Sequence, residues 1–146
     1  MMTLTAALLS LITVGLHYEA LVFISFFVRK VWKSRRVGVA LAVTLALGAH
    51  ITEVGVYSVA WYLLIDAGAV ELAHFDMEVF EPTLLDIFYF SGTVYSSLGF
   101  GDIVPVRGGH VLAVTESVTG LVLIAWTASY TFFEMQTHWR DVRGGL

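Results

Sequence analysis

The chain has 146 residues, of which 58% are hydrophobic and 14% charged, and its formal net charge is −4. Three long apolar stretches are more than a soluble fold of this length can bury, so the composition excludes an ordinary soluble protein and predicts one membrane domain. The absence of cysteine excludes disulfides and thiolate metal sites, and the net charge alone neither favours nor excludes a nucleic-acid partner.

The first two apolar stretches, residues 4 to 28 and 37 to 65, each exceed the roughly 20 residues that a helix needs to cross a bilayer. The first lacks a basic segment before it and a small-residue cleavage site, so we expect a retained helix and not a signal peptide. In the second, small residues recur every four positions and predict a face for close helix contact; they are Gly38, Ala42 and Ala46. Aromatic residues near the span ends predict interfacial belts; they are Trp32, Trp61, Tyr62 and Trp139.

The charges predict the topology. Basic residues are concentrated in the loop at residues 29 to 36 and in the tail at Arg140 and Arg143, whereas the segment from Asp66 to Asp86 has six acids and no Lys or Arg. By the positive-inside rule, the basic loop and the C-terminus are cytoplasmic, while the N-terminus and the acidic loop lie outside. We expect a multi-pass protein of the plasma membrane, the inner membrane if the source is bacterial. A membrane flank accounts for the basic run, so no nucleic-acid partner is expected.

A short helix is predicted before the third apolar stretch, which covers about residues 109 to 133. Pro82 near the first turn, with acids at Glu81 and Asp86, is typical of a helix start. About a dozen helical residues span some 18 Å, which is too short to cross a bilayer, so the segment must enter and return. Its negative C-terminal end would face a cavity that holds a cation.

Two glycines flank an aromatic residue directly after this helix, in Ser96-Ser97-Leu98-Gly99-Phe100-Gly101-Asp102. Glycine adopts backbone angles that other residues avoid, so successive carbonyls of such a strand can point at one axis. A ring of these strands replaces the hydration shell of a monovalent cation. The motif therefore predicts ion binding by backbone oxygens.

Residues 97–102 resemble the selectivity filter of the potassium channel pore-domain family, whose usual form is Thr-Val-Gly-Tyr-Gly-Asp. Ser97 keeps a hydroxyl, Leu98 stays aliphatic and Phe100 keeps the aromatic ring. The resemblance extends to neighbouring segments and covers a little over one third of the chain. Tyr89 and Phe90 match the aromatic pair that braces the filter, Ser96 and Ser97 match its paired threonines, and Gly120 lies close to the usual hinge glycine of the inner helix.

The resemblance implies an all-α membrane protein in which three transmembrane helices are joined by a re-entrant pore helix and a selectivity filter. It implies a potassium-selective channel that assembles as a homotetramer, conducts K+ passively, and has neither enzyme activity nor a cofactor. On this basis residues 1–65 hold two helices and a basic cytoplasmic loop, residues 66–81 form an acidic extracellular loop, and residues 82–146 hold the pore helix, filter, inner helix and a short cytoplasmic tail.

The same resemblance assigns roles to individual residues. The carbonyls of Ser97, Leu98, Gly99 and Phe100, with the Ser97 hydroxyl, would bind K+, Gly101 would end the filter, and Asp102 would lie at the outer mouth. The Phe100 ring would pack outward against the pore helix. Residues expected to support the filter are Tyr89, Phe90, Thr93, Ser96 and Glu116. Gly120 is either a hinge or a packing position, and residues expected to line the lower pore are Leu121, Ile124, Ala128 and Phe132.

Ionisable residues within apolar helices are costly and usually have a buried partner; here they are His17, Glu19, His50, Glu53 and Glu116. His50 and Glu53 are three residues apart and share a helix face. They form either a metal or proton-relay site, or a pairing with each other or with His17 and Glu19. We prefer the pairing, because two ligands do not define a metal site. Glu116 either accepts hydrogen bonds from Thr93 or Ser91 behind the filter or contacts the outer helices.

Two other functions are compatible with these patterns. A nonselective cation channel shares the architecture, although the Gly-Phe-Gly strand argues against it. A membrane-embedded enzyme or accessory subunit would use His50 and Glu53 to bind a metal or a quinone. Substitution of His50 or of Gly99 separates the two classes.

Overall fold

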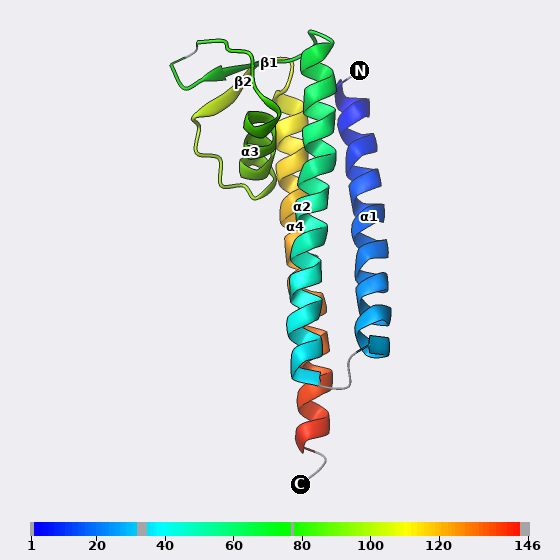
Figure 1. The fold of residues 1–146 in the computed structure, drawn as a ribbon. Helices are drawn as coiled ribbons and strands as arrows, with labels where there is room; N and C mark the ends of the chain where they lie inside the picture. Colours follow the sequence, from blue (N-terminus) through cyan, green and yellow to red (C-terminus); the bar gives the residue numbers. More distant parts are fainter. Residues whose placement is uncertain (1, 32–34, 77, 144–146) are drawn as a thin grey trace.

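Three long helices form the body of the protein in a computed structural model, which describes residues 2–31, 35–76 and 78–143 (Figure 1). They are α1 (Met2–Val31), α2 (Arg35–Asp66) and α4 (His110–Arg143). Each contains a segment long and apolar enough to cross a membrane, at Met2–Val28, Val37–Asp66 and His110–Gln136. The three predicted spans are therefore confirmed as helices. The last helix runs to Arg143, so the expected tail is helical up to that residue.

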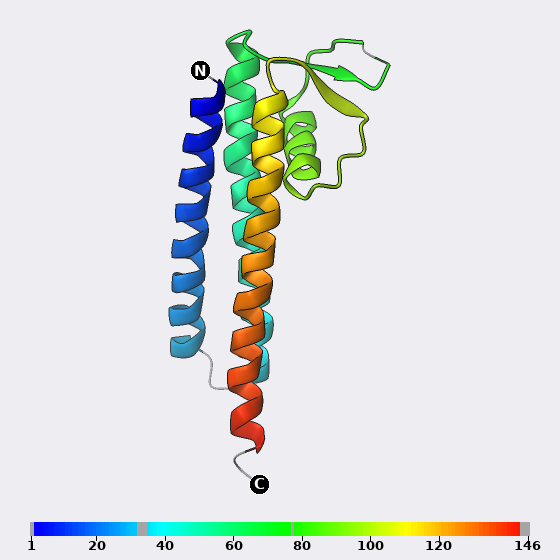
Figure 2. The ribbon, with the colours of Figure 1, turned by 180° about the vertical axis from the view of Figure 1, so that it is seen from behind.

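The helices alternate in direction along the bundle, as the two opposite views show (Figures 1 and 2). The start of α1, the end of α2 and the start of α4 lie at one end, and the end of α4 lies at the other. Strand β1, within the acidic segment, is at the first end, and the end of α1 and the start of α2 are at the second. The helix ends that flank the basic loop thus share one end of the molecule with the end of α4, as the charge pattern requires.

The short helix α3 (Leu84–Tyr95) packs beside α2 and α4 in the half of the bundle nearest the start of α4 (Figure 1). Thr83 caps it, because the Thr83 side chain accepts from the Asp86 amide and the Asp86 side chain accepts from the Thr83 amide. The helix therefore begins after Pro82 and not at it. Residues 96–102 then return to the end of the bundle from which the chain came.

A small antiparallel sheet, which the all-α prediction did not include, closes this segment at both ends. Strand β1 (Glu71–His74) precedes α3, strand β2 (Ile103–Arg107) follows the returning loop, and Leu72 pairs with Pro105. The strands are short and far apart in sequence, so neither local periodicity nor a hairpin turn signals their pairing. The sheet fixes the start and the finish of the α3 segment relative to each other.

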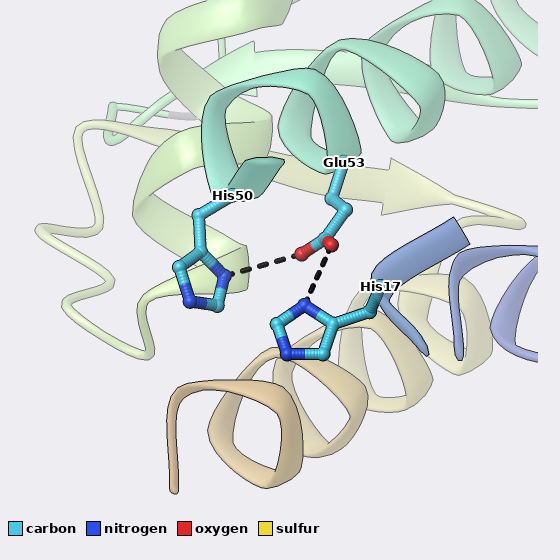
Figure 3. Close-up of side chains that lie close together, drawn as sticks. All are labelled: His17, His50 and Glu53. Carbon is cyan, nitrogen blue, oxygen red and sulfur yellow. Dashed lines mark hydrogen bonds and ion pairs between the residues drawn. The ribbon is translucent and has the colours of Figure 1, made fainter. Parts of the chain in front are cut away.

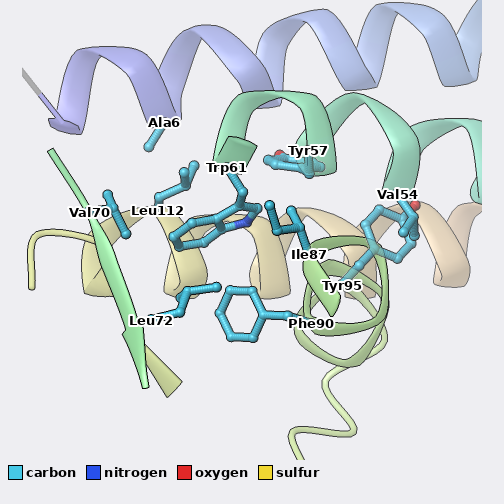
Figure 4. Close-up of a cluster of buried hydrophobic side chains, with 10 residues drawn as sticks. All are labelled: Ala6, Val54, Tyr57, Trp61, Val70, Leu72, Ile87, Phe90, Tyr95 and Leu112. Carbon is cyan, nitrogen blue, oxygen red and sulfur yellow. The ribbon is translucent and has the colours of Figure 1, made fainter. Parts of the chain in front are cut away.

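The main hydrophobic core lies where α2, α3, α4 and β1 meet (Figure 4). Trp61 is fully buried in it, with Leu112, Leu72 and Phe90 around the indole. The Trp61 and Phe90 ring centroids are 5.0 Å apart and the rings are edge to face. The expectation that Trp61 lies in an interfacial belt is therefore wrong, whereas its neighbour Tyr62 is exposed.

A second cluster joins α1 to the lower part of α2, where Ala42 and Ala46 pack with Leu21 and Ile24. A Cβ added at Gly38 would lie 3.1 Å from the Val28 side chain. The predicted small-residue face is thus confirmed as the contact with α1. The belt residue Trp32 lies outside the described residues, as do the side chains of Trp139, Arg140 and Arg143.

Candidate functional site

The loop after α3 alternates in backbone hand. Ser97, Gly99 and Gly101 have φ values of 59°, 49° and 77°, and the residues between them are not in this region. Alternating hand aligns successive peptide groups, so their N–H groups share one side of the strand and their carbonyls the other. Ser97 adopts a conformation that is uncommon for a residue with a Cβ, which is typical of functional positions.

Hydrogen bonds from two helices hold the loop in this shape. The Ser97 amide donates to the Val94 carbonyl at 2.9 Å, and the Ser97 hydroxyl lies 2.7 Å from the Ser117 hydroxyl of α4. The Gly99 amide donates to the Thr93 carbonyl at 3.1 Å. Thr93 and Ser96 use their own hydroxyls within α3. Thr93 therefore supports the strand through its backbone and not through its side chain.

The far end of the loop is tied back to α3 by Tyr89. Its phenol donates to Asp102 Oδ2 at 2.7 Å, and its ring stacks with the Phe100 ring at a centroid distance of 6.5 Å. The hydrogen bond from Tyr89 lowers the pKa of Asp102 and raises the pKa of the Tyr89 phenol. The Phe100 ring thus packs on the short helix, on the side from which Tyr89 holds Asp102.

Glu116 of α4 connects the three elements behind the loop. It accepts from the Ser91 hydroxyl of α3 at 2.6 Å and from the Trp61 indole of α2 at 2.7 Å, and it is fully buried. Both interpretations of Glu116 therefore hold, with Ser91 and not Thr93 as the α3 partner. The sequence did not predict Trp61 as a partner of Glu116. A buried indole N–H needs an acceptor, and an intramembrane carboxylate such as Glu116 is a suitable one.

Gly120 allows α4 to touch the end of α3. A Cβ at this position would lie 2.0 Å from the Tyr95 carbonyl oxygen, a distance that no side chain tolerates. Helix α4 is continuous through Gly120. In this structure Gly120 therefore serves close packing, and the four residues expected to line a lower pore, Leu121, Ile124, Ala128 and Phe132, are all exposed on the single chain.

A polar cluster lies where α1, α2, α3 and α4 meet, and we call it the histidine cluster: His17, His50, Glu53, Tyr95 and Thr127. His17, Glu53 and Tyr95 are buried, and His50 and Thr127 are partly exposed. Figure 3 shows His17, His50 and Glu53. The two imidazole rings approach the Glu53 carboxylate from two sides, with His17 Nδ1 at 2.8 Å and His50 Nδ1 at 3.1 Å. The preferred pairing is thereby confirmed for His17, His50 and Glu53. Glu19 is exposed, so the expectation that it joins them is wrong.

Whether the histidine cluster binds a metal ion depends on the number of its ligands and on the charge of the occupied site. Donor atoms of His17, His50 and Glu53 lie within 4.8 Å of one another, and three protein ligands are enough for an open zinc site. A divalent ion with one carboxylate would leave a net positive charge within the apolar layer, which is expensive. We therefore do not assign these residues as metal ligands.

Comparison with protein families decides the class. A family model described as "Ion channel" matches residues 49–136, more than half of the chain. The protein belongs to this ion channel family. No curated protein and no solved structure matches the chain.

The matched region of the channel begins in the middle of α2 and includes α3, the loop at 96–102 and α4 as far as Gln136. The second half of α2, for which the sequence suggested no family, is therefore part of the channel domain. Helix α1 lies outside the match. Of the histidine cluster, only His17 comes from α1, and it is one of several α1 residues with polar contacts to the channel domain. Ser10 contacts the Thr119 hydroxyl at 2.9 Å, and Ser25 donates to the Tyr130 hydroxyl at 2.9 Å.

Proposed function

We propose that the channel conducts K+ selectively, with ions held by the carbonyls of residues 97–100. The alternating backbone hand at Ser97, Gly99 and Gly101 carries this proposal, because it turns successive carbonyl oxygens to one side of the strand. Carbonyl oxygens in this arrangement replace the hydration shell of K+. Gly101 would end the filter, and Asp102, held by Tyr89, would lie at its outer mouth.

A homotetramer would complete the pore, since one chain supplies one such strand. Apolar side chains next to the loop support this assembly. Leu98, Val114 and Val118 are 59%, 64% and 57% exposed on the single chain. Beside them is a groove of about 330 Å³ that Ser97, Gly99 and Ser117 also line. A neighbouring copy would cover this apolar rim while leaving the carbonyls toward the axis.

The orientation in the plasma membrane follows from the charges. The end with the acidic segment would lie outside, and the end with residues 29–36 and the C-terminus would be cytoplasmic. Helix α3, with 12 residues, would then enter the membrane from outside, and the loop at residues 96–102 would return to the same side. Its C-terminal end, with a partial negative charge, would face the ion pathway.

The alternatives differ in what they require. The family match favours a channel over a membrane enzyme, and His50 and Glu53 bind each other and their neighbours. A nonselective cation channel would use the same strand without discrimination between ions. Selectivity is therefore the property to measure.

The test is ion flux from liposomes that contain the purified protein, comparing K+ with Na+ and adding Ba2+ as a blocker. We expect K+ flux far above Na+ flux and block by Ba2+. Gly99→Ala should abolish this selectivity, because the φ of Gly99 is +49° and a Cβ there disfavours the strand conformation.

Gly68→Ala is a matched control. Gly68 also has a positive φ, +65°, and like Gly99 it has no heavy atom within 4 Å of an added Cβ. Its substitution imposes the same kind of backbone strain outside the loop, so selectivity should persist. Equal K+ and Na+ flux in the wild-type protein would contradict the proposal and favour a nonselective channel.

A further inference from the structure

The two imidazoles of the histidine cluster share two partners, and His50 Nδ1 has a third in the Tyr95 hydroxyl at 2.9 Å. Both Nδ1 atoms face the Glu53 carboxylate, at 2.8 Å from His17 and 3.1 Å from His50. Both Nε2 atoms face the Thr127 hydroxyl of α4, at 3.2 Å from His17 and 2.9 Å from His50. The contacts form a closed ring through α1, α2 and α4, and His17 and Glu53 are buried.

This ring contains more contacts than neutral side chains can serve. Each of the four contacts needs one proton. Two neutral imidazoles supply one N–H each, and Thr127 supplies one O–H. The Tyr95 hydroxyl also lies 2.9 Å from His50 Nδ1, but its one proton goes to Glu53, so toward His50 its oxygen is a further acceptor and supplies no proton. With two neutral rings and an ionised Glu53, one contact would bring two lone pairs together.

We propose that the histidine cluster is a proton-binding site that takes up one additional proton, shared by the two imidazoles and Glu53. With this proton every contact has a donor and an acceptor. The net charge of the cluster also becomes zero. The proton either converts one imidazole to an imidazolium, which offsets the Glu53 carboxylate, or neutralises that carboxylate directly. Without the proton the site carries a net negative charge within the apolar layer, and with a divalent ion it carries a net positive one.

The described groups around the cluster offer no other counter-charge. From α2, Tyr57 lies beside Tyr95 with ring centroids 6.4 Å apart, and from α4, Trp126 lies 5.5 Å from the His17 ring. Glu116 is engaged by Ser91 and Trp61, and Glu19 on α1 is exposed. Among the described side chains, no Lys or Arg hydrogen-bonds to the cluster. The proton is therefore the cation that pairs with Glu53.

The proton connects α1 to the loop that follows α3. Tyr95, which donates to Glu53, is the last residue of α3 and lies two residues before Ser97. Loss of the proton at higher pH removes one of the four hydrogen bonds of the ring. Either His17 of α1 or His50 of α2 then loses its bond to Thr127 or to Glu53. Raising the pH should thus weaken the attachment of α1 and the hold on Tyr95.

The decisive experiment counts protons in the full-length protein in lipid bilayers. Imidazole ¹⁵N and Glu carboxyl ¹³C NMR shifts report the protonation of each group, and His17→Gln and His50→Gln spectra assign the two rings. At neutral pH we expect the cluster to hold one additional proton. The reference state for this count is two neutral imidazoles beside an ionised Glu53. Release of the additional proton on raising the pH should accompany a fall in the melting temperature. Two neutral rings beside an ionised Glu53 at neutral pH would overturn the proposal.

Two threonine variants test the role of the hydroxyl. Thr127→Val removes the partner of both Nε2 atoms, so the proton affinity should fall by about tenfold or more. Thr52→Val is the matched control, because the Thr52 hydroxyl is exposed and donates to Gly48 of its own helix. An unchanged proton affinity in Thr127→Val would overturn the proposal. So would stoichiometric binding of added Zn2+ at the imidazole nitrogens, which would make this a metal site.

Discussion

At the scale of single residues, the contact between Gly120 and Tyr95 depends on one absent methyl group. Gly120→Ala should destabilise the protein by about 1–3 kcal/mol, because the Cβ would overlap the Tyr95 carbonyl 2.0 Å away. Gly48→Ala, in an open helical position, should be neutral or slightly stabilising. Thermal unfolding in detergent compares the two variants. Similar melting temperatures for both would show that α4 moves away at no cost and would favour the hinge interpretation.

The bond between Tyr89 and Asp102 predicts a response to acid. The hydrogen bond from the Tyr89 phenol lowers the pKa of Asp102. The bond therefore stabilises the fold fully at pH values above the ordinary pKa range of a carboxyl group, and this stabilisation is lost as the pH falls through the lowered pKa of Asp102. In Tyr89→Phe the Asp102 carboxylate should take up its proton at a higher pH. Flux measured during acid titration should therefore change at a higher pH than in the wild type.

Tyr62→Phe is the control for this titration, because Tyr62 is exposed near the same end of the bundle but belongs to α2. It should titrate as the wild type does. If Tyr89→Phe also titrates as the wild type does, the hydrogen bond does not hold Asp102 in the membrane-embedded protein.

At the scale of elements, α3 depends on its cap, since a helix of 12 residues is marginal by itself. Thr83→Ala removes the side-chain acceptor of the Asp86 amide and should cost about 1 kcal/mol. Thr83→Ser keeps the hydroxyl and should restore most of the loss. Melting temperatures of the two variants test this, and equal values would mean that the sheet and the core alone define the start of α3.

The two-stranded sheet is the element that places the loop at 96–102. Strand β1 precedes α3 and β2 follows the loop, so their pairing closes the segment on itself. Arg107 and Glu71, which face each other across the two strands, also form an exposed ion pair at 2.9 Å. Pairs of this kind contribute little, so the register rests on the backbone and on the buried Leu72.

At the scale of the whole molecule, the prediction is the number of chains. Native mass spectrometry of the detergent-solubilised protein should give the mass of four chains of 16.1 kDa each. Val118→Asp would place a charge in the apolar rim of the groove beside the loop and should dissociate the assembly. Val43→Asp, an exposed position on α2, is the comparison. A stable monomer or dimer in the wild type would leave the filter strand without partners.

The sequence by itself determined the class of the protein and most of its elements. Long apolar runs have only one stable solution in a bilayer, which is a helix, and the segment between Pro82 and Tyr95 is too short to be another span. The positive φ of Gly99 and Gly101 is likewise a local preference, because glycine adopts these backbone angles without steric cost. These features needed no knowledge of neighbours.

Only the tertiary structure decided which side chains meet. Trp61 reads as an interfacial residue, yet it lies in the core because Glu116, 55 residues later, accepts its N–H. His17 and Thr127 complete the cluster around Glu53 from helices that are distant in sequence. The physical reason is that a buried polar group must find a partner wherever the fold brings one within reach. The spacing of residues along a sequence does not predict hydrogen bonds between side chains on different helices.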